Sequence, residues 1–98
     1  METDKEAVRR RVEDLKRYID RSEHIAEKLR KIVTTLRTFI VELSIEHEVY
    51  KARYGSEDWI VEDTLRRLED AEMKITDHLK SILISIRTAE EELRQYGS

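Results

Sequence analysis

The chain has 98 residues, of which 42% are charged and 39% hydrophobic, and a formal net charge of −3. It contains two glycines, no proline and no cysteine, which excludes a disulfide framework, a thiolate metal site and a cysteine nucleophile. The slight negative charge argues against an electrostatic nucleic-acid binder, and apolar runs such as Phe39-Ile40-Val41 are far shorter than the ~20 residues of a membrane span. Because two glycines cannot supply the turns of a sheet fold, we expect one small all-helical domain.

The first predicted element is a helix over residues 4–54. Thr3 and Glu6 form a capping box, which predicts its start. Apolar residues then recur at alternating steps of four and three, the spacing of a and d positions in heptads. A strand-like alternation around Val41 is the competing interpretation, but the uninterrupted heptads favour the helix. The a and d positions are Val8, Val12, Leu15, Ile19, Ser22, Ala26, Leu29, Val33, Leu36, Ile40, Leu43, His47, Tyr50 and Tyr54.

The only internal break is the segment Tyr54-Gly55-Ser56-Glu57-Asp58. Gly55 suits the left-handed position that ends a helix, and Ser56 is a good N-cap for the next one. We therefore expect a turn at residues 55–56 and a second helix over residues 57–96. Its a and d positions are Val61, Leu65, Leu68, Glu72, Ile75, Leu79, Ile82, Ile86, Ala89, Leu93 and Tyr96.

So short a turn makes the two helices antiparallel neighbours. The predicted fold is all-α: residues 1–98 form a single long two-helix hairpin of the coiled-coil type. Pairing a with d positions outward from the turn places His47 opposite Leu68 and Leu43 opposite Glu72. In this register Leu15 has no partner in the second helix.

The first helix has a wider apolar face than a two-helix hairpin requires. Its g positions include Tyr18, Ile25, Ile32 and Phe39, which is typical of a bundle helix with more than one neighbour. The g positions of the second helix that face them are small or partly polar: Ala71, His78 and Ser85. Large side chains against small ones leave room for another helix, so we expect a homo-oligomer, with a dimer forming a four-helix bundle. A complementary helical partner would satisfy the same face.

Three polar residues occupy core positions of the heptads: Ser22, His47 and Glu72. His47 and Glu72 fall in adjacent layers, where an imidazole and a carboxylate could form a hydrogen-bonded pair. The first interpretation is a buried polar layer that fixes register and partner number. The alternatives are a pH-sensitive element and a metal or acid/base site.

A further apolar group lies on outward positions near the turn. Val41, Ile45 and Val49 fall at b, f and c positions of the first helix, and Trp59 and Ile60 at outer positions of the second. A patch that holds tryptophan suggests a surface for a partner protein.

The chain also lacks asparagine and has one glutamine, Gln95, a depletion typical of thermophile proteins. Its Gly55-Ser56-Glu57-Asp58 turn, its unbroken heptads, its arginine- and glutamate-rich surface and the residues His47 and Glu72 resemble those of computationally designed helical hairpins. Such hairpins assemble into bundles with buried polar networks. The resemblance implies a self-associating scaffold without catalytic activity.

The predicted function is therefore a non-catalytic structural protein whose partner is a second copy of itself. We expect no cofactor, metal, nucleic acid, membrane or small-molecule substrate. Because no apolar segment follows Met1-Glu2-Thr3-Asp4, we also expect a soluble protein without a targeting signal. A binding module that presents Trp59 and Ile45 to a protein is the second hypothesis, and a metal or acid/base bundle built on His47 and Glu72 is the third.

Overall fold

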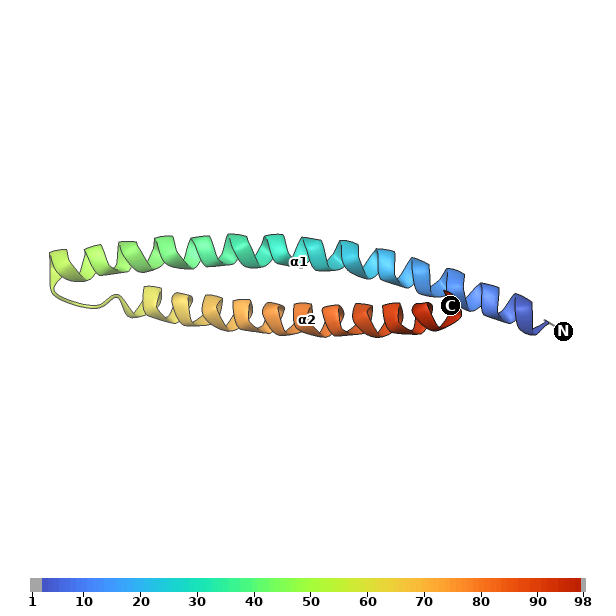
Figure 1. Ribbon diagram of the computed structural model, residues 1–98. Coiled ribbons are helices and arrows are strands. Elements are labelled where there is room, and N and C mark those ends of the chain that lie inside the picture. The colour runs from blue at the N-terminus through green and yellow to red at the C-terminus, as the bar shows by residue number, and fades with distance from the viewer. Residues whose placement is uncertain (1–2, 98) are drawn as a thin grey trace. The chain divides into compact units, whose positions relative to one another are not determined.

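The computed structural model describes residues 3–97 and contains two helices, α1 (Asp4–Tyr54) and α2 (Trp59–Gly97), which run antiparallel (Figure 1). The stretch around Val41 is helical, and residues 3–97 contain no strand. The prediction of an all-α antiparallel two-helix hairpin is therefore confirmed.

The hairpin divides into two compact units, and both helices contribute to each. The terminal unit combines α1 up to Lys28 with α2 from Leu79 onward, whereas the turn unit spans Leu29–His78 and includes the connection between the helices. Residues at a and d positions are the buried ones in both units. These are Leu15, Ser22, Ala26, Ile86 and Ala89 in the terminal unit and Val33 and His47 in the turn unit.

Both ends of α1 have the caps that the sequence predicts. Thr3 Oγ1 accepts a hydrogen bond from the Glu6 N–H at 3.2 Å, which satisfies one of the free amides of the first turn. Gly55 has a φ of 70°, and its N–H donates to the Lys51 carbonyl at 2.8 Å. This is the left-handed C-cap for which glycine carries no steric penalty.

The start of α2 differs from the prediction by two residues. The helix begins at Trp59 rather than at residue 57, and its N-cap is Asp58 rather than Ser56. Asp58 Oδ1 accepts hydrogen bonds from the N–H groups of Ile60 at 3.0 Å and Val61 at 3.4 Å. A carboxylate at this position also interacts favourably with the helix dipole, so Asp58 provides a stronger start than a serine two residues earlier.

In the turn unit, the register between the helices differs from the expected one. His47 Nε2 lies 3.5 Å from Glu62 Oε1, whereas its predicted neighbour was Leu68, six residues further along the chain. Arg37 donates its Nε–H to Glu72, and Arg37 likewise precedes the predicted partner of Glu72 by six residues. The predicted register was therefore wrong by close to one heptad.

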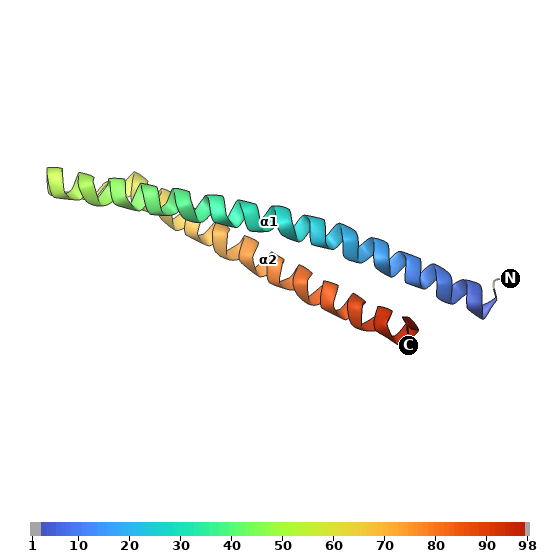
Figure 2. The same cartoon turned by 45° about the horizontal axis from the view of Figure 1, so that its top comes forward.

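The connection between the helices explains this shift. Four residues, Gly55 to Asp58, separate the two helices instead of the two that were expected. In Figures 1 and 2, α2 begins short of the end of α1, because the connection runs back beside the last turns of α1. Since the a and d faces repeat every seven residues, a shift of about one heptad keeps the same faces in contact.

The terminal unit shows a register change in the same direction. Arg11 of α1 forms hydrogen bonds with Glu92 of α2, and Leu15 and Ala89 line the same groove. Leu15 is 4% exposed, although the predicted register left it without a partner in the second helix. α2 therefore covers a part of α1 that the sequence analysis left open.

The N-cap assignment predicts different effects for two substitutions in the connection. Asp58→Ala removes the acceptor for two amides of α2 and should lower the free energy of unfolding by about 1 kcal/mol. Ser56→Ala removes no cap and should change it by less than about 0.5 kcal/mol. Urea denaturation followed by circular dichroism measures both, and a larger loss for Ser56→Ala would contradict the assignment.

Candidate functional site

His47 is the most buried titratable side chain in the turn unit. It is 5% exposed, and neither of its ring nitrogens has a hydrogen-bond partner among residues 3–97; the same is true of the Thr76 hydroxyl. Glu62 provides the nearest carboxylate, at 3.5 Å from Nε2. The Glu62 side chain is 35% exposed, so the imidazole is enclosed while the carboxylate reaches solvent.

The structure separates the three residues of the predicted polar layer. Ser22 is buried in the terminal unit, and His47 in the turn unit. Glu72 is only half-buried and pairs with Arg37. His47 and Glu72 therefore have different partners, and the carboxylate beside the imidazole comes from Glu62.

An ionic network surrounds the imidazole and ties the connection to both helices. Lys51 Nζ lies 3.1 Å from Glu48 and 3.8 Å from Glu57, and its hydrogen bond with Glu48 is the main cause that raises the pKa of Lys51. The contact with Glu57, followed by the neighbouring His47, lowers the pKa of Glu62 below its ordinary value of 4.5. Glu62 therefore remains ionised at neutral pH, and the network holds the turn end of the hairpin.

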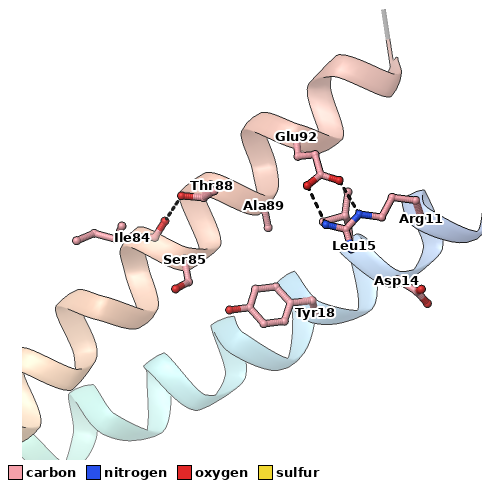
Figure 3. A pocket seen from close by; sticks show the side chains of 9 residues that line it. All are labelled: Arg11, Asp14, Leu15, Tyr18, Ile84, Ser85, Thr88, Ala89 and Glu92. Atoms are coloured by element: carbon pink, nitrogen blue, oxygen red, sulfur yellow. Dashed lines mark hydrogen bonds and ion pairs between the residues drawn. The ribbon is translucent and has the colours of Figure 1, made fainter. Parts of the chain in front are cut away.

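A groove lies between α1 and α2 in the terminal unit (Figure 3). It has a volume of about 520 Å³. The ring of Tyr18 projects into it toward the α2 residue Ser85 (Figure 3). The groove is lined from α1 by Arg11, Asp14, Leu15 and Tyr18 and from α2 by Ile84, Ser85, Thr88, Ala89 and Glu92.

Most polar groups of this groove are bound to other groups of the chain. The Arg11 guanidinium donates two hydrogen bonds to Glu92, at 2.6 and 2.8 Å. This arrangement raises the pKa of Arg11 and lowers that of Glu92. Thr88 donates to the Ile84 carbonyl at 3.0 Å, and Asp14 accepts from Arg17. The groove therefore offers a small molecule few polar groups that are not already bonded.

The g positions of α1 form a row of half-exposed apolar side chains. Tyr18 and Ile32 are each 46% exposed, and Ile25 and Phe39 each 49%. Neighbouring a and d residues such as Ala26 and Val33 are buried. On α2, Ala71 is half-buried, and His78 and Ser85 are exposed. The hairpin thus leaves about half of each large g side chain in contact with water.

The second apolar group is more exposed than this row. Val41, Ile45 and Val49 are all more than half exposed, and Trp59 is 74% exposed. Ile60 follows Trp59 at 59%. All five lie in the turn unit. Because they are exposed in the single hairpin, a partner protein could contact them.

Within residues 3–97, no group of three or more His, Cys, Asp or Glu side chains is placed to hold a metal ion. Neither helix is long and apolar enough to cross a membrane.

Comparison with known proteins adds no relative. No protein-family model, no curated protein and no solved structure matches this chain.

Sequence reasoning missed the inter-helix pairs His47–Glu62 in the turn unit and Arg11–Glu92 in the terminal unit. Glu62 is an acidic residue at an e position of the second helix, but the expected register directed attention to Glu72 as the partner of His47. Arg11 and Glu92 occupy g positions of opposite charge on the two helices. Comparing the charges at g positions in every possible register is the signal that would have found this pair.

The orphaned imidazole predicts a stabilising substitution. His47→Leu replaces a buried polar ring that has no hydrogen bond with an apolar side chain, and should raise the free energy of unfolding by about 1–2 kcal/mol. His24→Leu, at an exposed position of the same helix, should change it by less than about 0.5 kcal/mol. Denaturant titration near pH 8 measures both. Destabilisation by His47→Leu would show that the contact with Glu62 contributes more than the buried ring costs.

The Arg11–Glu92 pair predicts a pH-dependent contribution to stability. Because the pKa of Glu92 is lower in the folded state, its contribution is complete above the ordinary glutamate pKa and is lost as the pH falls through the folded value. Glu92→Gln should therefore lower Tm at neutral pH, and the difference from the unmodified protein should shrink at a pH below the ordinary glutamate pKa. Glu91→Gln, at the exposed neighbouring position, is the control. An equal Tm difference at both pH values would contradict the ion pair.

Proposed function

We propose that this protein is a non-catalytic structural scaffold that self-associates, with two hairpins forming a four-helix bundle. The observation that carries the proposal is the row of half-exposed g side chains on α1, which includes Tyr18, Ile25, Ile32 and Phe39. In a hairpin that acts alone, these positions are ordinarily polar, because only the a and d positions meet the other helix.

The apolar area that the hairpin leaves exposed on these side chains favours association. Complete burial of an isoleucine or phenylalanine side chain stabilises a protein by about 1.5–3 kcal/mol. Because half of each side chain remains exposed, covering the rest contributes about 1 kcal/mol per residue. Repetition of the row on a second chain doubles this contribution, which offsets the loss of translational and rotational freedom on association.

The composition supports an idealised scaffold of the designed type. The chain has no asparagine and no proline, and both helices run without an internal glycine. Charged residues cover the surface, with opposite charges spaced three or four residues apart, as in Arg67 and Asp63 or Lys74 and Asp70. Designed helical proteins use these same devices to favour helix and solubility.

Solution mass tests the proposal directly. Light scattering at increasing concentration should give a limiting mass of twice the 11.8 kDa of one chain. Ile32→Gln should weaken self-association by about tenfold or more, because two polar side chains enter each interface. Ile45→Gln changes an isoleucine of similar exposure on the same helix and should leave the association unchanged. A monomer at every concentration would overturn the scaffold.

The exposed group around Trp59 favours a second candidate function, a module that binds another protein. Trp59 is the most exposed large apolar side chain among those in residues 3–97, and tryptophan is enriched in the energetic centres of protein interfaces. Because the chain has one tryptophan, its fluorescence separates the two functions. Self-association through the α1 row leaves the emission of Trp59 unchanged, whereas association through the Trp59 end shifts it to shorter wavelength and is sensitive to Ile45→Gln.

A further inference from the structure

A groove lined only by α1 residues is wide enough to accept a side chain of another helix. It lies in the turn unit, has a volume of about 280 Å³ and is lined by Lys31, Ile32, Thr35 and Leu36. The Thr35 hydroxyl donates to the Lys31 carbonyl at 3.0 Å, so its hydrogen bond is already made and its methyl group can contact an apolar guest. The groove runs between the Lys31–Thr35 and Ile32–Leu36 rows of α1, and a side chain of a second helix, the knob, packs into a groove between two such rows.

Phe39 has the properties of the matching knob. It lies one heptad after Ile32 and is 49% exposed. A two-fold axis beside Thr35 and Leu36 places Phe39 of one chain against Ile32 of a second antiparallel chain, and the reverse, because both positions are equally far from that axis. A parallel pair would place Phe39 against Phe39 and leave both grooves without a knob.

The charges beside the groove favour the same orientation. Lys31 lies on the N-terminal side of the groove, and Glu42 and Glu46 on its C-terminal side. No ion pair of these three side chains is found within residues 3–97. Lys31 and Glu42 are eleven residues apart, which is three helical turns and therefore the same side of α1. Antiparallel packing brings Lys31 of each chain to Glu42 of the other, whereas parallel packing brings like charges together.

We propose that a second copy of this chain packs antiparallel against α1 in the turn unit, with Phe39 of each chain in the groove that Lys31, Ile32, Thr35 and Leu36 of the other chain form. The inference rests on the proposed self-association and specifies its orientation and register. The Lys31–Glu42 pairs on both sides of the two-fold axis select this arrangement over the parallel one.

Single-cysteine variants test the position of the axis, since the chain has no cysteine of its own. Thr35→Cys lies beside the proposed axis and should form a disulfide-linked dimer under mild oxidation. Thr34→Cys is the matched control, because Thr34 also donates its hydroxyl to the carbonyl four residues before it but lies on the side of α1 away from Ile32 and Phe39. A cross-link in Thr34→Cys but not in Thr35→Cys overturns the inference.

Charge reversal tests the orientation independently. Lys31→Glu and Glu42→Lys should each weaken self-association by about tenfold, because each replaces two attractive contacts with two repulsive ones. An equimolar mixture of the two variants should recover a dimer that contains one chain of each, as measured by light scattering and native mass spectrometry.

The outcomes separate this inference from the function on which it rests. A dimer by mass whose Thr35→Cys variant does not cross-link, or whose reversed chains do not recover on mixing, overturns the proposed arrangement and leaves the scaffold standing. A monomer at every concentration overturns both. Cross-linking of Thr35→Cys together with recovery in the mixture supports both.

Discussion

The seven-residue repeat of apolar side chains is the constraint on which this structure depends. It keeps one face of each helix toward the other, and the buried residues of both units fall on it, from Leu15 to His47 in α1 and at Ile86 and Ala89 in α2. Both helices continue for many turns because the sequence has no proline and its one internal glycine, Gly55, lies between them. Local propensity, capping and hydrophobic pattern all agree, which is why the fold class was predictable from the residues alone.

The same repeat explains why the register was not predictable. A periodic face fits its partner equally well when displaced by one period, so the choice depends on the connection and on specific pairs. The connection was two residues longer than expected because Asp58, not Ser56, caps α2. Two short polar residues separated by Glu57 both satisfy the sequence rule for an N-cap, and only the backbone geometry distinguishes them.

The polar residues of the site show the consequence of that ambiguity. His47 was recognised as a core residue from its heptad position, which holds in any register. Its neighbour changes with the register, and Glu62 therefore stands where Leu68 was expected. Burial of a side chain is a property of one helix face and can be predicted from spacing. A contact between two side chains depends on both helices and needs the register as well.

The hairpin leaves apolar side chains exposed on several sides of α1. No large side chain within residues 3–97 is completely buried, because a pair of helices covers only one stripe of each. Between Ile32 and Val49, α1 carries apolar side chains toward α2, at the g positions Ile32 and Phe39, and at Val41 and Ile45. A helix that is apolar on several sides is ordinarily surrounded by neighbours. In the proposed self-association, a second copy covers the g positions of α1, whereas Val41 and Ile45 remain exposed.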